Sequence, residues 1–501
     1  MSYGLATDQG VDMSEMASTP FSETKAPESA ERLHRGALGL VDISASTMAN
    51  IGPAYSFFFS FGLIVMTAGI GAPLTIVAAA IAIALLGNTL AQFSRAQPST
   101  GGFITFVGKS FGGTSAVTTA LLCGAGYIIA ISSVLVVSGW FLGYTLSYYL
   151  GWNIPWIILS IVLTAGAVVM MLRGVGVSTR LAGFFFGFEM LVLVVISVVL
   201  LIKNSAHLSA APFEPRNIHN GFSGLAAGFP LAIYLFIGWE NSAALAEETG
   251  NPRRNVPRAV FLSIAAMAVS YLLFAYATVT GFGYNEARLT SPSILVPFIT
   301  VAHGAAASLA FFAYLAGLTS TLGVLIAAVN SQARLIFNAG REGLLPRWIG
   351  RVEPSRQVPR NAIFTFVGIA SLIIAVWALG HLIFGHSGSM DGLTYFDESG
   401  TMGTILVLVV YFLANLALPF YYRKYRPAEF NVIKHAVLPV LGMIAIAVPV
   451  YYLSKPGQAA PYSWFPYVAL GILVVSVIYA ALLTRRDPGL GERVGSIVAD
   501  E

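Results

Sequence analysis

The sequence predicts an all-α, polytopic membrane protein with twelve transmembrane helices, the first ten forming a five-plus-five inverted repeat. Hydrophobic residues make up 56% of the 501 residues and charged residues only 10%, and the mean hydropathy is +0.76. A soluble domain cannot bury so much apolar surface. Apolar stretches close to the ~20 residues that a spanning helix needs recur along the chain. Two of them contain helix-breaking residues near their centres.

The predicted spans follow one another with short polar connections. Three of them exceed the thickness of a bilayer, so they must tilt, break or project into water. In chain order the twelve spans are 38–69, 73–93, 114–149, 154–172, 179–202, 223–246, 259–283, 304–338, 361–384, 401–422, 432–453 and 464–484.

The basic residues predict the orientation of these spans. Of the 27 Lys and Arg residues, most fall in the N-terminal segment, in alternate connections or after the last span. Cytoplasmic loops have such an excess of Lys and Arg, so we expect both termini to be cytoplasmic and the membrane to be the plasma membrane. The basic residues on the opposite side are Lys203, Arg216, Arg288 and Lys455.

Polar segments flank the spans. Residues 1–35 are polar and predict a disordered cytoplasmic tail without the basic start and short apolar core of a cleaved signal. Residues 486–501 predict a cytoplasmic C-terminal tail. The net charge of +4 follows from the membrane orientation and gives no reason to expect a nucleic acid partner. The single cysteine, Cys123, excludes an intrachain disulfide.

Two spans are interrupted near their middles. One contains Ala-Asn-Ile-Gly-Pro-Ala at 49–54, and the other contains Phe-Ile-Gly-Trp-Glu at 236–240. Gly and Pro free backbone groups that lipid cannot satisfy, so each break must face protein or a water-filled cavity. Broken helices at matching positions of two halves indicate the binding site of a secondary transporter.

The positions of the breaks also define the predicted domains. The transport core covers 36–425, with one repeat at 36–203 and the other at 222–425. Five spans per repeat is an odd number, so the second repeat is inverted relative to the first. Residues 426–485 form helices 11 and 12, which lie outside the repeat and are peripheral or lie at an oligomer contact.

Several motifs resemble those of amino acid–polyamine–organocation (APC) transporters. Residues 236–243 and 246–259 look like the sixth span of that family and the loop after it. The Pro-Ser-Thr-Gly-Gly at 98–102 is similar to its loop after span two, and 331–334 with 340–346 resemble the end of its eighth span. The resemblance covers most of 36–425 and implies a LeuT-like inverted-repeat fold.

The resemblance also implies transport of amino acids or amines, coupled to protons or driven by exchange, with no cofactor beyond a proton or cation gradient. In this family the substrate is held by exposed backbone at the breaks of spans one and six. Tyr234 matches an aromatic that stacks on the substrate, and Trp239 is expected to gate the pocket or to pack as an ordinary aromatic. The implied substrate-binding residues are Ile51, Gly52, Pro53, Ala54, Tyr55, Cys123, Tyr127, Tyr234, Phe236, Ile237, Gly238 and Trp239.

The first break departs from the Gly-rich pattern of the family. Pro53 has no N–H and cannot donate a hydrogen bond to a substrate carboxylate. The N–H groups of Ala54 and Tyr55 begin a new half-helix, however, and a helix N-terminus binds anions through its free donors and its dipole.

Two acidic residues lie deep within apolar spans. An intramembrane carboxylate is costly and is a functional candidate by default. Glu240 matches a residue implicated in proton sensing in some members of the family; it either changes protonation during transport or braces the break by accepting N–H groups. Glu189 falls where some proton-coupled relatives have a lysine; it either binds a cation or a proton, or it is a protonated acid bonded to Ser320 or Thr321.

A further acidic pair, Glu247 and Glu248, has arginines close by in sequence. The pair forms either an inner latch or a solvated ion-pair network with Arg253, Arg254 and Arg258.

From these features we expect a secondary active transporter that moves an amino acid by alternating access with proton coupling. The alternatives are an amino acid/amine exchanger, a polyamine or organic amine importer, and, in another class, a passive channel. An enzyme is not expected, because no nucleophile elbow, zinc-binding helix or phosphate loop occurs, and neither is a metal site. The expected partners are a small-molecule substrate and the bilayer, and a homo-oligomer is left open.

Overall fold

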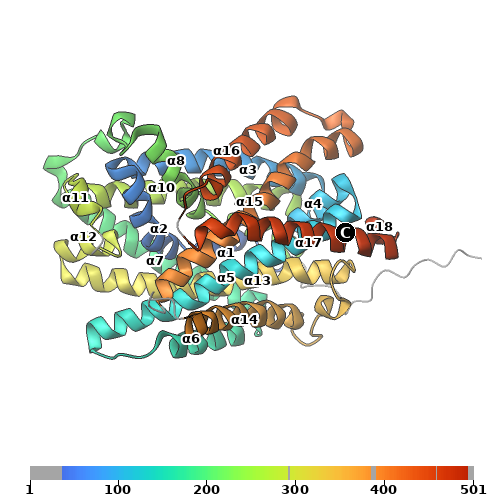
Figure 1. Cartoon of the computed structure of the whole chain (residues 1–501), viewed down its shortest axis with the longest axis horizontal. Coiled ribbons are helices and arrows are strands. Elements are labelled where there is room, and N and C mark those ends of the chain that lie inside the picture. The colour runs from blue at the N-terminus through green and yellow to red at the C-terminus, as the bar shows by residue number, and fades with distance from the viewer. Residues whose placement is uncertain (1–35, 292–293, 385–390, 459, 495–501) are drawn as a thin grey trace, which may run out of the picture.

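The computed structural model describes residues 36–291, 294–384, 391–458 and 460–494, and within these the fold is helical (Figure 1). The only β-type pairings among them are two isolated bridges, Leu38 with Thr249 and Glu353 with Val358. The predicted disordered tail at 1–35 lies outside the described residues.

The helices differ widely in length, and several long ones run side by side (Figure 1). The long helices are α1 Leu40–Ile51, α2 Pro53–Ala68, α3 Ala72–Ala96, α5 Gly113–Leu150, α6 Trp156–Met171, α7 Val175–Lys203, α8 Gly221–Tyr234, α10 Pro252–Gly281, α13 Ala307–Arg341, α14 Arg360–Phe384, α15 Gly392–Tyr425, α16 Leu438–Ser454 and α17 Phe465–Arg486. The shorter α-helices are α4 Gly102–Phe111, α9 Asn241–Ala244, α11 Glu286–Leu289, α12 Pro297–Ala305 and α18 Leu490–Arg493. A 3-10 turn, η6, spans Ala246–Glu248.

Length and composition make many of these helices able to cross a membrane. Within the described part of the chain, nine helical runs are long and apolar enough, and the first of them, Leu40–Ala96, includes the break after α1 and the turn before α3. Two shorter apolar helices, Trp156–Met171 and Gly221–Tyr234, add to these. The structure is therefore that of an all-helical, multi-pass protein.

The first predicted break is present. Gly52 separates α1 from α2 with φ +64°, a left-handed conformation that only glycine adopts readily. A Cβ at this position would overlap the side chain of Val324 on α13. Pro53 then occupies the first position of α2, where its missing N–H costs nothing.

The second predicted break is also present. The α8 helix ends at Tyr234, residues 235–240 form consecutive turns, and the short α9 follows. Gly238 has φ +106°, which again requires a glycine. The chain therefore loses regular helical structure at both places that the sequence predicted.

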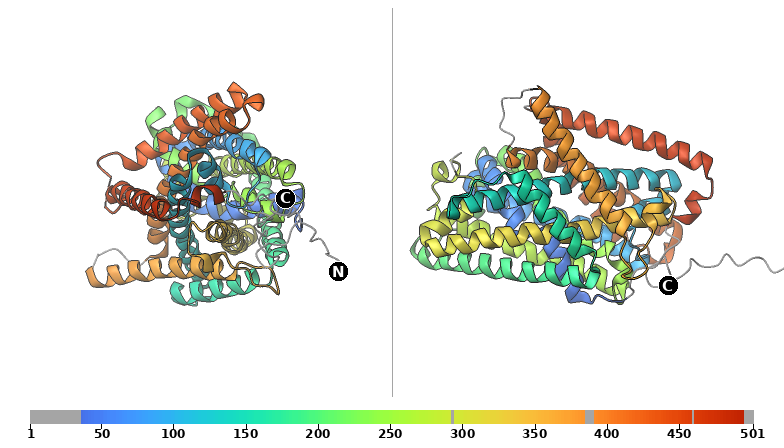
Figure 2. Two further views of the ribbon diagram at one scale, coloured as in Figure 1. Left: turned by 90° about the vertical axis from the view of Figure 1, so that its right-hand side faces the viewer. Right: turned by 90° about the horizontal axis from the view of Figure 1, so that it is seen from below.

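Burial separates central from peripheral helices. In α5 and α15 the most apolar window is 72% buried, whereas in α17 it is 17% buried and in the run Ile433–Ser454 22%. Seen along the long axis, α16 and α17 lie at the edge of the bundle (Figure 2). This agrees with the expectation that the last two spans are peripheral.

The chain beyond α17 differs from a simple tail. The four-residue α18 lies against the start of α5, where Gly491 approaches Gly113. The Arg493 guanidinium donates to the Glu342 carbonyl at 3.4 Å and pairs with Asp487. This pairing holds the pKa of the Asp487 carboxyl below its usual range. The described part of the predicted tail is thus folded onto the helical core.

Candidate functional site

The two breaks meet inside the bundle. The Asn50 side-chain amide at the end of α1 donates to the carbonyl of Gly238 at 3.1 Å. A Cβ on Gly238 would lie 2.9 Å from the Asn50 nitrogen, so the close approach itself requires a glycine. The bond joins segments that are 188 residues apart in sequence.

The backbone groups freed by the first break find side-chain partners. The Ile51 carbonyl accepts from the Ser56 hydroxyl at 2.6 Å. The Tyr55 N–H donates to the Ser320 hydroxyl at 2.9 Å, and the Ala54 N–H donates to a carboxylate described below. An unsatisfied backbone group in the membrane interior costs several kcal/mol, and these bonds avoid that cost.

A cavity of about 50 Å³ lies between the breaks. By the space that one water requires, this volume holds a few waters and is smaller than the volumes typical of ligand pockets. Its lining combines apolar side chains with polar groups. The lining residues are Asn50, Ile51, Tyr55, Ser56, Tyr127, Ala130, Ile131, Val134, Tyr234, Ile237, Gly238, Val324, Ala328 and Gln332.

Six of the residues predicted to bind substrate are among those that line this cavity: Ile51, Tyr55, Tyr127, Tyr234, Ile237 and Gly238. Gly52, Pro53 and Ala54 form the break itself without lining the cavity.

The other three predicted substrate-binding residues pack elsewhere. Trp239 is fully buried against Phe103 and Tyr411, with ring centroids 6.3 and 5.6 Å away. Phe236 packs edge-on against Tyr271 at 5.4 Å. Cys123 is buried and does not line the cavity.

Glu240 lies directly behind the cavity wall. The Tyr127 hydroxyl donates to Glu240 Oε1 at 2.7 Å, and the Gly238 N–H donates to Glu240 Oε2 at 3.2 Å. The carboxylate is 4% exposed. Glu240 is therefore bonded both to the unwound segment and to the tyrosine that lines the cavity.

Glu189, on α7, lies at the N-terminus of α2. Its Oε2 accepts from the Ala54 N–H at 2.9 Å, and the residue is fully buried. Its other oxygen, Oε1, has no hydrogen-bond partner among the described residues. A negative group at a helix N-terminus is stabilised by the free N–H groups and by the dipole. The two donors that the sequence analysis assigned to a substrate carboxylate are thus bonded to Glu189 and to Ser320.

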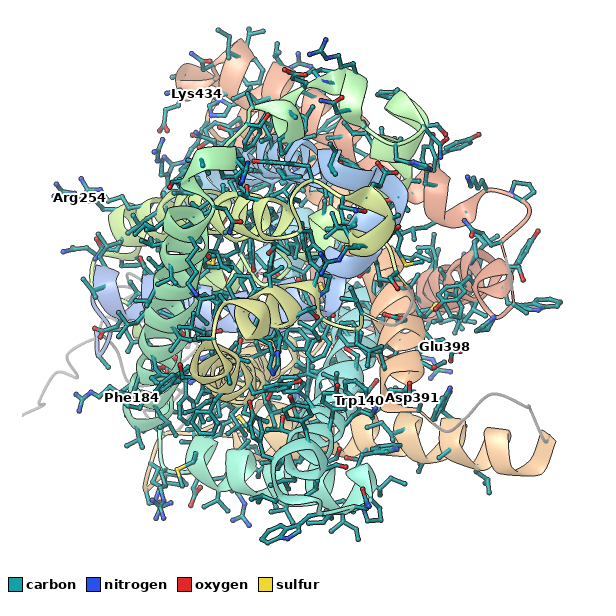
Figure 3. The ribbon with its side chains drawn as sticks, turned by 90° about the vertical axis from the view of Figure 1, so that its left-hand side faces the viewer. Trp140, Phe184, Arg254, Asp391, Glu398 and Lys434 are labelled. Atoms are coloured by element: carbon teal, nitrogen blue, oxygen red, sulfur yellow. The ribbon has the colours of Figure 1, made fainter. Side chains whose placement is uncertain are left out.

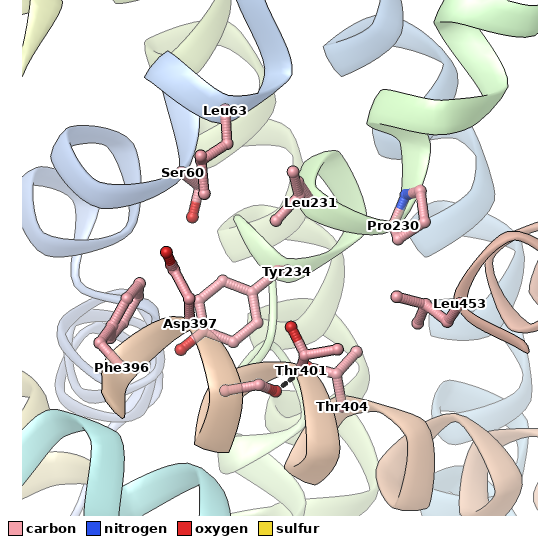
Figure 4. Close-up of a pocket in the computed structure, with 11 residues that line it drawn as sticks. Ser60, Leu63, Pro230, Leu231, Tyr234, Phe396, Asp397, Thr401, Thr404 and Leu453 are labelled. Carbon is pink, nitrogen blue, oxygen red and sulfur yellow. Dashed lines mark hydrogen bonds between the residues drawn. The ribbon is translucent and has the colours of Figure 1, made fainter. Parts of the chain in front are cut away.

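Aromatic side chains close one side of the cavity. The hydroxyls of Tyr55 and Tyr234 lie 3.1 Å apart, and Phe396 packs edge-on against both rings at 5.6 and 5.9 Å. Beyond them lies a second, smaller pocket of about 30 Å³, to which Tyr234 and Phe396 also contribute with Asp397 (Figure 4). The start of α15 lies on this side. Its first residue, Gly392, lies close to the side chain of Trp140. Figure 3 labels Trp140 beside Asp391, the residue that precedes α15.

Two buried ion pairs connect the loop after α9 to α13. Arg334 donates to both oxygens of Glu248, at 2.6 and 3.1 Å. Arg341 donates to both oxygens of Glu247, at 2.7 and 3.2 Å. All four side chains are at most 3% exposed. The bases observed here, Arg334 and Arg341, lie on α13 and were not among the arginines that the sequence predicted for these acids.

Several site residues were missed by the sequence analysis. Asn50 and Gln332 were quoted only as parts of motifs, yet both line the cavity, and Gln332 Oε1 is buried without a hydrogen-bond partner in the described residues. Arg334 and Arg341 were counted as loop charges. Their spacing of seven residues could have indicated a shared role, because it places both side chains on one face of a helix. The same helix, α13, also lines the cavity.

Comparison with known sequences identifies the family. The amino acid permease family model matches residues 38–481. The branched-chain amino acid permease BcaP of Bacillus subtilis is 23% identical over 473 residues, which cover 90% of this chain and 94% of BcaP. The uncharacterized amino acid permease YecA of Bacillus subtilis is 22% identical, and the match covers 59% of this chain and 66% of YecA. The Asc-type amino acid transporter 1 of Mus musculus is 27% identical, covering 68% of this chain and 64% of that protein.

Solved structures support the fold. A manganese transporter from Eremococcus coleocola superposes with a TM-score of 0.53 at 12% identity, covering 89% of this chain and 95% of that one. Mhp1, a nucleobase-cation-symport-1 family transporter, superposes with a TM-score of 0.50 at 14% identity, covering 94% and 99%. At such identities the likeness shows the fold alone. Because the family model spans most of the sequence, the chain belongs to the amino acid permease family and is an APC-superfamily membrane permease.

Proposed function

We propose that the protein moves a neutral amino acid across the plasma membrane by alternating access, with uptake driven by protons. The observation that supports this best is the meeting of the two breaks at one cavity, with Asn50 bonded to Gly238 at 3.1 Å. Discontinuous helices whose ends face a common cavity are the usual binding site of secondary transporters.

The proposal includes a topology of twelve spans. Ten form the five-plus-five core, and α16 and α17 supply the last two. Most basic residues fall on one side of these spans, and we assign that side, with both termini, to the cytoplasm.

A neutral substrate suits the cavity. Its apolar wall includes Ile131, Val134 and Val324, which fit an aliphatic side chain. Gln332 Oε1, buried without a partner in the described residues, is a suitable acceptor for the substrate ammonium group. Among the described residues no carboxylate lines the cavity, whereas a polyamine would need several acids to offset its desolvation. The branched-chain substrates in the name of BcaP agree with this chemistry.

Glu189 provides a mechanism for coupling. Its carboxylate holds the Ala54 N–H, which does not line the closed cavity, and a substrate carboxylate that enters an open form of the protein would compete for that donor. Protonation of Glu189 removes its charge and frees that donor for the substrate. One proton then enters with each substrate carboxylate, and Glu240 keeps the unwound segment in place through Gly238 and Tyr127.

Two closures make alternating access workable. The layer of Tyr55, Tyr234 and Phe396 closes one side of the cavity, and the Glu247 and Glu248 ion pairs fasten the other side to α13. We assign the aromatic layer to the external side, and transport then requires each closure to open in turn.

The proposal is tested with the purified protein in proteoliposomes. Labelled leucine, alanine, lysine and putrescine are offered with and without an inward proton gradient. We expect saturable uptake of a neutral amino acid that the gradient accelerates. Counterflow without any response to the gradient would instead assign an exchanger, and linear, non-saturating flux would assign a channel.

A further inference from the structure

A large apolar groove lies on the outer surface of the bundle, away from the transport cavity. It has a volume of about 760 Å³ and lies between α6 and α14, which run near each other in Figure 1, with α5 as its floor. It extends along α6 from Trp156 to Leu172, a distance of about 24 Å at 1.5 Å per residue. Its length exceeds the ~15 Å of hydrocarbon in one leaflet.

The walls of the groove are almost entirely apolar. Exposed side chains along it include Ile157, Ile161 and Val169 on α6 and Phe364 on α14. Gly368 on α14 faces open space, because a Cβ there would have no atom within 4 Å. The groove is thus a channel for hydrocarbon within the membrane-spanning part of the protein.

Arginines gather at one end of the groove only. The Arg356 guanidinium donates to the carbonyl of Leu172, the last groove residue of α6, at 3.1 Å. Arg360 lies over the ring of Phe364 at 5.5 Å, and Arg173 directly follows Leu172. All three arginines are exposed. The one acid in the adjoining loop, Glu353, accepts from the Ser355 hydroxyl at 3.3 Å.

The opposite end of the groove lacks this charge. Residues 151–155, which precede Trp156, contain no Lys, Arg, Asp or Glu. An apolar channel with a basic mouth matches the chemistry of an anionic lipid, whose hydrocarbon and phosphate need opposite environments. Basic pockets between transmembrane helices on the cytoplasmic side bind such headgroups.

We propose that this groove binds an anionic glycerophospholipid, with one acyl chain between α6 and α14 and its phosphate at Arg173, Arg356 and Arg360. The lipid bridges helices that belong to different halves of the chain, and it contacts α5, which also lines the transport cavity. The site does not depend on the identity of the transported solute.

Native mass spectrometry of the full-length protein in detergent tests the site. The protein is titrated with dioleoylphosphatidylglycerol and, separately, with dioleoylphosphatidylcholine. We expect tighter binding of phosphatidylglycerol. In the R356Q/R360Q variant its affinity should fall roughly thirtyfold, since each arginine near the membrane surface contributes about 1 kcal/mol. The matched control is R485Q/R486Q, which removes the same charge from the end of α17 and should leave the affinity unchanged.

A second pair of variants tests the groove. Gly368→Leu places a side chain in the open space and should weaken binding of both lipids, whereas Gly471→Leu, at an equally open position of α17, should not. Leucine is a better helix former than glycine, so neither change should unfold its helix. Equal affinity for the two lipids, equal losses in the two arginine variants, or a Gly368→Leu effect on oligomer mass in place of lipid count would overturn the proposal.

Discussion

Single side chains decide how the freed backbone of this permease is satisfied. The Ala54 N–H donates to Glu189, the Asn50 amide donates to the Gly238 carbonyl, and the Gly238 N–H donates to Glu240. The acids could be located from the sequence because a carboxylate is rare in an apolar span, and the breaks because helix-breaking residues stand near the middle of two spans. It did not predict that Glu189 and Ala54 are partners, since 135 residues separate them and only the packing of α7 against α2 brings them together.

At Glu189 we predict a change in coupling. Glu189→Gln resembles the protonated acid, so it should bind substrate without a proton and lose the acceleration of uptake by an inward proton gradient. Proteoliposome uptake at matched and unmatched pH measures this. The control is Ser56→Ala, which removes the donor to the Ile51 carbonyl at the same break, leaves Glu189 in place and should keep the response to the gradient.

For Glu240 the prediction separates coupling from bracing. Glu240→Gln retains an oxygen that accepts from Tyr127 or from Gly238. If the carboxylate only braces the break, uptake should keep its pH dependence and the melting temperature should change little. Loss of pH dependence with an unchanged melting temperature would instead make Glu240 a second proton site. Tyr127→Phe, which removes one hydrogen bond, provides the comparison.

At the scale of elements, the breaks were predictable and their surroundings were not. Gly52 and Pro53 predict a helix break without any tertiary information. Glycine tolerates a positive φ, and proline cannot continue a preceding helix. The start of α15 was predicted at residue 401, but the helix begins at Gly392. Its first turns are polar on the sequence scale and are stabilised by tertiary contacts, such as the bond from Trp377 to Glu398 at 2.9 Å.

For the first break we predict a glycine requirement with two parts. Gly52→Ala places a Cβ in the left-handed region, which costs about 1–2 kcal/mol, and also overlaps the side chain of Val324. Thermal unfolding should show a larger loss than for Gly151→Ala, where φ is +70° but no atom lies within 4 Å. Adding Val324→Ala should restore part of the loss at Gly52 only; an equal effect in both backgrounds would contradict the overlap.

Over the whole molecule, the two closures that we propose for the cavity are unlike, one aromatic and one ionic. From the sequence, Glu247 and Glu248 form either an inner latch or a solvated ion-pair network with arginines that are close in the chain. The observed partners, Arg334 and Arg341, are on α13. Arg334 is 86 residues from Glu248 in the sequence. Local charge patterns therefore indicated the right acids, and the fold adds Arg334 and Arg341 as bases that are distant in sequence.

We predict that weakening this ionic closure opens the cavity toward its side. Removing one member of a buried pair typically costs about 3–5 kcal/mol, because the remaining charge is left unpaired. In a Cys123→Ala background, a cysteine at Ala328 in the cavity wall would report access to an impermeant maleimide. Arg334→Gln should speed labelling from the side of α18, and the exposed Arg254→Gln should not. Unchanged labelling in Arg334→Gln would show that the pair does not close the cavity.

The carboxylate at the start of α2 has a consequence for ion selectivity. Because Glu189 already places a negative group on the open N-terminus, a small inorganic anion such as chloride meets repulsion there and gains little from the helix dipole. A zwitterion carries its own compensating cation and avoids that penalty. We therefore expect the break to favour molecules that carry both charges and to disfavour the passage of halide ions through the empty carrier.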